Sequence, residues 1–320
     1  MCHTSGSAAF AFSAMIVLSV YGSGDFALGG AAFGGMPGIV RKLAFLAAFF
    51  GFGVKAAVFP LHVWLPRASA APTPVTALLH AVAVVNAGVF AVLRMIYDVF
   101  GADGLAGTWA QSIALAAGVV TIVFGAVMAV RDTHVKRKLA YSTVSNLGYM
   151  LLGASLMRAS GLRGALMHLV CHGLMKMGLF FCIGAVMVQT GKREVWEMRG
   201  LARRMPATFG FFVFSAVALM GIPPLCGFVS KFYLAGAALE LGGAWAWIGV
   251  GALLLSTVLT AIYQLSVLLP AFFLPAEGEA GRCDPGWRML LPLAVLAAAV
   301  LLVGVHPQPL VEALRAVAGM

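Results

Sequence analysis

The composition of this 320-residue chain excludes an ordinary soluble domain. Of its residues, 62% are hydrophobic and 10% are charged, whereas soluble domains carry about 25% charged residues. The net charge of +10 arises from Lys and Arg in short loops between apolar segments, which is typical of membrane topology signals and not of a nucleic-acid partner. The five cysteines show neither CxxC pairing nor metal-ligand spacing, so we assign them no redox or zinc role. The sequence therefore predicts an α-helical integral membrane protein.

Apolar segments follow one another along the whole chain. A membrane-spanning helix needs about 20 apolar residues, and no polar linker between the segments is long enough to hold a soluble domain. The pattern predicts one transmembrane domain over residues 1–320, an all-α polytopic bundle of about nine to ten spans. We expect the spans at 6–21, 44–61, 75–98, 112–130, 139–156, 162–189, 208–220 with 228–241, 244–273 and 290–305.

Two of the loops between these segments are strongly basic. Residues 131–138 contain four Lys or Arg and one acid, and residues 192–204 contain five Lys or Arg and two acids. Two predicted spans separate the loops, so both lie on the same side of the membrane. The positive-inside rule places that side in the cytoplasm.

Proline clusters interrupt the helical pattern at two places. The first, residues 59–76, follows Lys55, and the second, residues 221–227, precedes Lys231. Proline kinks a helix and removes a backbone donor, and non-helical backbone at membrane depth survives only inside protein or beside a wet cavity. Transporters build ion sites from such discontinuous helices, so we predict two broken helices at a transport site, with breaks at Pro60, Pro66, Pro72, Pro74, Pro223 and Pro224.

Six ionisable side chains are expected at membrane depth: Lys55, His80, His168, His172, Lys176 and Lys231. Three of them, at 168, 172 and 176, recur every four residues and so share one helix face. A single buried His is ordinarily a satisfied hydrogen-bonding residue, but each Lys at the centre of a span costs about 2.5–3.5 kcal/mol on insertion scales. Desolvation favours the neutral form of an amine, and imidazole titrates near neutrality. The set predicts a proton relay.

The acidic residues do not provide partners for these groups. All eleven Asp and Glu fall in predicted loops or at span ends. Because an unpaired buried ammonium is costly, Lys55 is expected either to be neutral at rest or to meet an acid from another polypeptide or from missing sequence. The pair His168 and His172 has a spacing that suits zinc, but no Glu follows the first His and Lys176 one turn further on would repel a cation, so we expect no metal.

Four segments occur in an order that suggests a family. They are residues 55–80, which begin KAAVFPLHVWLP and end PTPVTALLH, residues 135–150 (VKRKLAYSTVSNLGYM), residues 168–176 (HLVCHGLMK) and residues 221–231 (GIPPLCGFVSK). In them the chain resembles the antiporter-like, proton-conducting membrane subunits. That family includes antiporter-like subunits of respiratory complex I, subunits of membrane-bound hydrogenases and the large subunits of Mrp-type cation/proton antiporters. The resemblance covers most of residues 44–240.

The resemblance implies a role for each matched residue. Lys55 would be the central lysine of the first broken helix, which family members pair with a glutamate on an earlier helix, and His80 would link two half-channels. Lys136 would match the lysine that opens the next motif. The three residues His168, His172 and Lys176 would form a connecting stripe, and Lys231 would be the ionisable group at the second broken helix. Family members have several helices before the one at residue 6, so the chain is expected to be N-terminally truncated or one part of a split subunit.

The resulting hypothesis is proton translocation by a non-redox subunit of an NADH:quinone oxidoreductase-like or hydrogenase-like complex. Its partners would be other membrane subunits, and its location a bacterial or archaeal inner membrane. No Gly-rich dinucleotide loop and no Cys cluster for iron–sulfur ligation is present in the sequence, so no cofactor is expected. Two alternatives stay open: a subunit of an Mrp-type sodium/proton antiporter, and a structural remnant that supports its neighbours without conducting ions.

Overall fold

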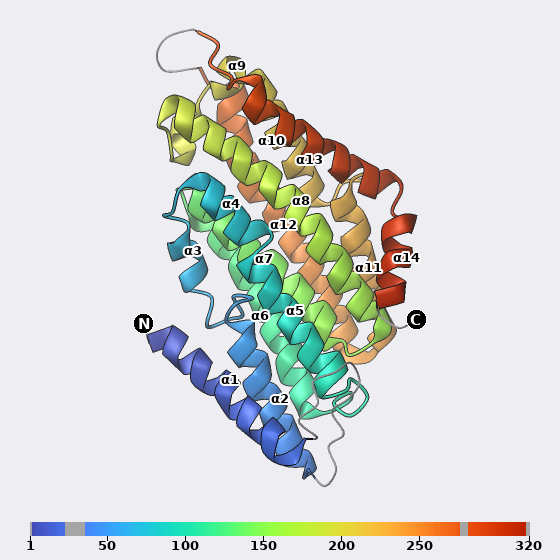
Figure 1. The fold of residues 1–320 in the computed structure, drawn as a ribbon. Helices are drawn as coiled ribbons and strands as arrows, with labels where there is room; N and C mark the ends of the chain where they lie inside the picture. The colour runs from blue at the N-terminus through green and yellow to red at the C-terminus, as the bar shows by residue number, and fades with distance from the viewer. Residues whose placement is uncertain (1, 23–35, 276–280, 318–320) are drawn as a thin grey trace.

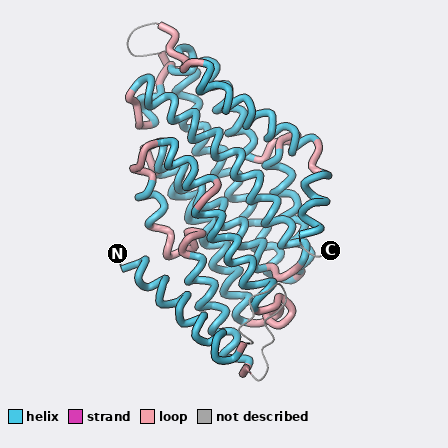
Figure 2. Tube along the Cα trace, in the orientation of Figure 1, coloured by secondary structure: helices cyan, strands magenta, loops and turns pink. Residues whose placement is uncertain are grey.

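The computed structural model describes residues 2–22, 36–275 and 281–317. These residues form a bundle of packed helices without any β-strand (Figures 1 and 2). Three of the acids expected in loops, Asp25, Glu277 and Glu279, lie outside the described residues. The helices are α1 (Cys2–Tyr21), α2 (Gly38–Gly53), α3 (Trp64–Ala68), α4 (Thr73–Ala81), α5 (Val84–Arg94), a π-helical turn (Met95–Val99), α6 (Trp109–Arg131), α7 (Val135–Ser155), α8 (Ala159–Thr190), a 3-10 turn (Val195–Met198), α9 (Leu201–Arg204), α10 (Pro206–Met220), α11 (Cys226–Leu241), α12 (Gly243–Phe273), α13 (Trp287–Val305) and α14 (Gln308–Val317).

The predicted all-α membrane bundle is confirmed. Within the described residues, five segments are long and apolar enough to cross a bilayer, and two shorter apolar helices accompany them. The five are Thr73–Val99, Trp109–Arg131, Ala159–Thr190, Gly243–Phe273 and Trp287–Val305, and the shorter ones are Ala8–Tyr21 and Pro206–Met220. Large apolar side chains stay exposed on the outer helices, for example Trp247 and Leu254 on α12, as expected of surfaces that face lipid.

Helix α8 runs through the middle of the bundle and is packed by α4, α7, α10, α11 and α13 (Figure 1). Helices α1 and α2 lie at one edge, and α13 and α14 at the opposite edge. The more polar helix α7 is buried over nearly its whole length. The backbone of α7 packs directly against the backbone of α6. A Cβ added to Gly125 would lie 2.5 Å from the Ser145 nitrogen, and one added to Gly148 would lie 2.7 Å from the Ile122 nitrogen. Small residues at such contacts let membrane helices approach closely.

The two basic loops meet at one end of the bundle, as the topology argument requires. The Val135 nitrogen donates to the Arg193 carbonyl at 3.0 Å, and the Val195 nitrogen donates to the Thr133 carbonyl at 3.0 Å. In the second loop the Glu197 carboxylate accepts the backbone N–H groups of Arg193 at 2.7 Å and Glu194 at 2.8 Å. These two bonds hold the pKa of Glu197 below its ordinary value.

Both predicted helix breaks are present. Helix α2 ends at Gly53, so the span expected over 44–61 is too long: residues 54–63 form turns, with a cis bond between Phe59 and Pro60. The chain becomes helical again in α3 and then in α4, which starts after Pro72. At the second break, Gly221 ends α10 with φ +89°, and a cis bond joins Pro223 to Pro224 before α11 begins.

A third break interrupts the span that was expected to be continuous over 75–98. Helix α4 ends at Ala81, directly after His80, and α5 starts at Val84. The nitrogens of Val82 and Ala83 both donate to the Leu78 carbonyl, at 3.1 and 3.0 Å. The Ala81 carbonyl instead accepts the side-chain amide of Asn86 at 2.9 Å. A side chain therefore replaces a backbone donor at this break, and no proline is needed to make it.

Candidate functional site

The His168, His172 and Lys176 side chains lie on the buried face of α8, and all three are fully enclosed. The Nε2 atom of His168 lies 3.1 Å from the Asn146 Oδ1 atom, and Nδ1 lies 2.9 Å from the Ser230 hydroxyl. Asn146 donates its own amide to the Ser142 carbonyl at 2.7 Å, which orients Oδ1 toward the imidazole. Because the Asn146 oxygen can only accept, His168 donates from Nε2. Its Nδ1 accepts from the Ser230 hydroxyl, whose proton is shared with the Gly227 carbonyl at 3.2 Å. The imidazole connects α7, α8 and α11.

Lys176 is the most deeply placed amine. Its Nζ atom donates to the Leu139 carbonyl at 3.0 Å and to the Ser142 hydroxyl, both on α7. Both acceptors are neutral oxygens, and the ion pairs of Arg94 with Asp98 and of Arg137 with Asp132 do not involve Lys176. A buried amine without a carboxylate partner can release its proton without leaving an orphaned anion behind.

Lys231 lies at the second break, where the last turn of α10 faces it. Its Nζ atom donates to the Leu219 carbonyl at 2.9 Å, to the Met220 carbonyl at 3.0 Å and to the Thr257 hydroxyl at 3.2 Å. The carbonyl end of a helix carries partial negative charge, so the break itself supplies the counter-charge. The ammonium also lies 5.5 Å from the centre of the Tyr149 ring, and it interacts electrostatically with His168.

His80 and His172 complete the row between Lys176 and the basic end of the bundle. His80 is fully buried, with its ring stacked on Phe180 at 5.2 Å. It lies within electrostatic range of Lys176 and Lys136, and His172 lies within range of Lys176, His168 and His80, with the His168 and His172 ring centres 6.3 Å apart. Among the described residues, neither ring nitrogen of His80 or His172 has a hydrogen-bond partner. Both imidazoles are therefore available to take or give a proton on either side.

Lys136 lies at the basic end of this row. The residue is only 6% exposed, and its Nζ atom donates to the Ala71 carbonyl at 2.6 Å, in the connection between α3 and α4. The row formed by Lys136, His80, Lys176, His172, His168 and Lys231 is called the polar row below. It passes the break after His80 and ends at the break between α10 and α11.

Lys55 differs from the expectation of a buried relay group, because its side chain is exposed. The backbone of Lys55 packs closely on α5, where a Cβ added to Gly88 would lie 2.6 Å from the Lys55 carbonyl carbon. Among the described residues, no hydrogen bond, ion pair or electrostatic contact joins the Lys55 ammonium to the polar row. The structure thus brings six of the seven predicted relay residues together and leaves Lys55 on the outside.

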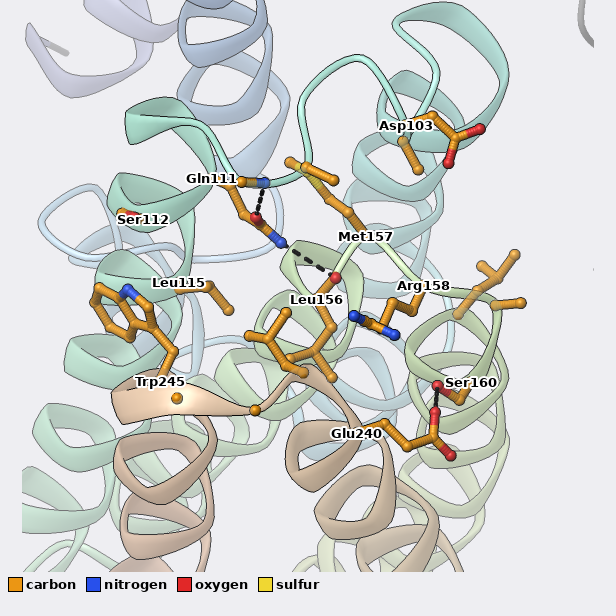
Figure 3. A pocket seen from close by; sticks show the side chains of 18 of the residues that line it. Asp103, Gln111, Ser112, Leu115, Leu156, Met157, Arg158, Ser160, Glu240 and Trp245 are labelled. Carbon is orange, nitrogen blue, oxygen red and sulfur yellow. Dashed lines mark hydrogen bonds between the residues drawn. The ribbon is translucent and has the colours of Figure 1, made fainter.

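Open pockets lie at opposite ends of α7 and α8. One, of about 970 Å³, includes Lys136, Arg193 and the residues between α3 and α4. The other, of about 930 Å³, is formed by the ends of α7 and α11 and the starts of α6, α8 and α12 (Figure 3). In the second pocket Gln111 donates to the Ser155 and Leu156 carbonyls at 3.1 and 3.2 Å, and Ser160 donates to Glu240. Polar groups are therefore accessible at both ends of the bundle.

Several partners of the polar row were not singled out from the sequence: Ser142, Asn146, Tyr149, Ser230 and Thr257. Ser142 and Asn146 are four residues apart and so share one face of α7, which was the available signal. Lys138, next to Lys136, has a different environment, because it donates to the Ala129 and Val130 carbonyls at the end of α6 at 2.9 and 3.3 Å.

Comparison with known proteins identifies relatives over most of the chain. The profile of the family described as NADH:quinone oxidoreductase/Mrp antiporter, TM, matches residues 1–260. NADH-quinone oxidoreductase subunit N of Desulforudis audaxviator is 38% identical over 290 residues, which cover 86% of this chain and 56% of that protein. Subunit L of Mycobacterium tuberculosis is 38% identical over 289 residues, covering 88% of this chain and 43% of that protein. The chain thus spans about half the length of the curated relatives it matches.

Solved structures share the fold. The Mrp complex from Dietzia sp. DQ12-45-1b contains a chain with a TM-score of 0.85 and 26% identity, and the match covers 99% of this chain and 66% of that one. Respiratory complex I from Thermus thermophilus with bound NADH contains a chain with a TM-score of 0.80 and 26% identity, covering 100% of this chain and 68% of that one.

Proposed function

The chain belongs to the NADH:quinone oxidoreductase/Mrp antiporter family of membrane proteins, and from this premise we propose that it carries protons across the membrane as a non-redox subunit of a complex I-like assembly. The polar row would be the path. Its partners would be other membrane subunits, as the names of the relatives indicate for those proteins, in a bacterial or archaeal inner membrane.

The observation that carries the proposal is the chemistry of the polar row. Two amines, Lys176 and Lys231, are bound by neutral oxygens, and three imidazoles lie along the row with them. These amines and imidazoles can gain or lose a proton while keeping the same neighbouring residues. Each proton transfer then changes the electrostatic energy of the next group in the row. Intramembrane ionisable residues that face a bundle interior commonly form proton relays.

The polar row supports protons over sodium as the transported ion. Sodium requires several oxygen ligands, and the carbonyl oxygens at the second break already accept from the Lys231 ammonium. A cation placed there would also be repelled by that ammonium. The runner-up is a sodium/proton antiporter subunit, supported by the similarity to the Mrp complex from Dietzia.

The proposal is tested by proton flux after His172→Leu. Because neither His172 nitrogen has a partner among the described residues, an apolar replacement leaves no protein donor or acceptor unsatisfied. In proteoliposomes that contain the assembled complex, flux should fall on the order of tenfold or more, while melting stays unchanged. His306→Leu, at the exposed C-terminal end of α13, is the matched control.

Flux that is unchanged by His172→Leu would refute the proposed path and favour the non-conducting scaffold. Flux that requires sodium in the wild type and responds to the sodium gradient would favour the antiporter reading.

A further inference from the structure

The 970 Å³ pocket at the basic end of the bundle has an unusual lining. No Asp or Glu lines it, and four of its lining side chains are Lys or Arg. These four are Arg67, Lys136, Arg137 and Arg193. Two acidic residues, Asp132 and Glu194, lie near the pocket without lining it. Asp132 pairs with Arg137 at 3.3 Å and accepts the His134 nitrogen at 2.9 Å, and Glu194 lies across the backbone bridge from His134. The pocket keeps an excess of positive charge after both are counted.

The backbone adds to this charge. Helix α4 begins at Thr73 and helix α7 begins at Val135, and residues of both starts line the pocket. Neither helix has a side-chain cap, and neither has an acid in its first turn. Pro74 has no N–H and the Val135 N–H donates to the Arg193 carbonyl, but the start of a helix still carries partial positive charge. Two helix starts beside the same pocket therefore favour an anion with several oxygen atoms.

Lys136 distinguishes the pocket from a cluster of exposed surface cations, because its side chain is buried and held in place. It is 6% exposed, and one proton of its ammonium is directed to the Ala71 carbonyl at 2.6 Å. The other two protons have no acceptor among the described residues. Burial lowers the pKa of His134, which lies beside Lys136 in the same lining, so His134 is neutral near pH 7 and can donate or accept a hydrogen bond there.

The mouth of the pocket is apolar on the side of α8. Val188 lines the pocket and is 73% exposed, and Met187 and Val63 are further apolar residues of the lining. The pocket therefore combines cationic side chains with apolar ones at the level of the basic loops. In a bilayer this is the level of the phosphate groups of the lipids, and basic pockets between helices on the cytoplasmic side suit anionic headgroups.

We propose that this pocket binds the phosphate headgroup of an anionic phospholipid, with Arg67, Arg193 and the two helix N-termini around the phosphate and the acyl chains lying past Val188. The site rests on the charge and shape of the pocket and does not depend on proton transport. A lipid at this place would be a fixed component of the protein surface next to Lys136.

The test compares lipid retention by the full chain and two variants. Native mass spectrometry of protein purified in a detergent without phosphate, with phosphatidylglycerol or phosphatidylcholine added, measures the apparent Kd for each lipid. Arg67 and Arg193 are exposed and outside the polar row, so the double variant Arg67→Gln/Arg193→Gln should fold. Loss of two cations should weaken phosphatidylglycerol binding on the order of tenfold. The single variant Arg67→Gln provides a second measurement with a smaller loss.

Arg203→Gln is the matched control, since Arg203 is an exposed residue of the same basic end outside the pocket. Preference for phosphatidylglycerol in the wild type and in this control, lost in the double variant, is the expected result. An equal preference in all variants would overturn the site, as would equal binding of the two lipids to the wild type. Displacement of phosphatidylglycerol by inorganic phosphate at equal concentration would overturn the lipid as the source of the phosphate.

Discussion

Replacing Lys176 with Met separates a proton-transfer role from a structural role. Methionine has nearly the same length and volume as lysine, so the buried space on α8 stays filled. The Leu139 carbonyl loses the ammonium but still accepts from the Ser142 and Thr143 hydroxyls, each at 3.1 Å. No backbone group is orphaned by the substitution.

Two effects of Lys176→Met on stability partly offset each other. A Lys at the centre of a membrane helix costs about 2.5–3.5 kcal/mol. The hydrogen bonds of a charged donor contribute about 1.5–3 kcal/mol each, and Lys176 makes two, one to a carbonyl and one to a hydroxyl. The two bonds together contribute about 3–6 kcal/mol against that cost, so we expect Lys176→Met to lower the free energy of unfolding by about 1–2 kcal/mol and to leave assembly intact.

Proton flux should respond very differently. Lys176 is the amine within electrostatic range of both His80 and His172, so its loss removes a proton-carrying group from the middle of the row. Flux through the assembled complex in proteoliposomes, followed with a pH-sensitive dye, should fall on the order of a hundredfold. Wild-type flux in a folded, assembled Lys176→Met variant would refute the assignment of the polar row as the path.

Lys138→Met is the matched control for the effect on proton flux. Lys138 is also buried and also donates two hydrogen bonds, but both go to carbonyls in the last turn of α6, and no group of the polar row is among its partners. We expect a loss of about 1 kcal/mol in the free energy of unfolding from the uncapped helix end, with flux preserved.

Further substitutions test other parts of the structure. His168→Gln should reduce flux and also lower the melting temperature, because the shorter amide cannot reach both partners of the imidazole and leaves a buried polar group unsatisfied, at about 1–3 kcal/mol. Gly227→Ala should prevent correct folding at the second break, since the new Cβ would lie 1.9 Å from the Ala218 carbonyl oxygen. A Cβ added to Gly236 on the same helix would meet nothing within 4 Å, so Gly236→Ala should be neutral or stabilising by up to about 1 kcal/mol. Equal melting temperatures of the two variants would contradict this packing. The pKa of Glu197 is lowered in the folded loop, so the stabilisation by its carboxylate is present above the ordinary Glu pKa of about 4.3 and is lost as the pH falls through the folded value. Hydrogen exchange of the two backbone amides that donate to Glu197 should therefore accelerate at acid pH relative to Glu197→Gln. Identical pH profiles for the two proteins would refute the capping role.

Features that depend on local chemistry were predictable from the sequence. Prolines near Pro60 and Pro223 mark the two breaks because the ring itself forbids a regular helix. The positions of His168 and Lys176 on one face follow from the helical period alone. Charge placement likewise put the two basic loops at one end, where the backbone bonds between residues 133–135 and 193–195 now join them.

Features that depend on tertiary contacts were not predictable in the same way. The break after His80 contains neither Pro nor Gly and is held by the Asn86 side chain, and an Asn in an apolar segment does not reveal which carbonyl it will reach. The exposure of the Lys55 side chain and the close approach of its backbone to Gly88 are likewise not visible in the periodicity of the sequence. Lys136 and Lys138 are neighbours of the same type, yet only the first lies beside His80.

The close contact of α6 with α7 at Gly125 and Gly148 has a consequence for how the protein can move. A Cβ added at either glycine would lie 2.5–2.7 Å from a backbone nitrogen of the other helix. Helices packed this closely cannot slide past each other without collision. The acceptors Ser142 and Asn146 belong to this locked pair, whereas the groups bonded to them, Lys176 and His168, lie on α8. The pair therefore acts as a fixed frame of reference, and a motion that opens or closes this part of the row is made by α8 moving against it.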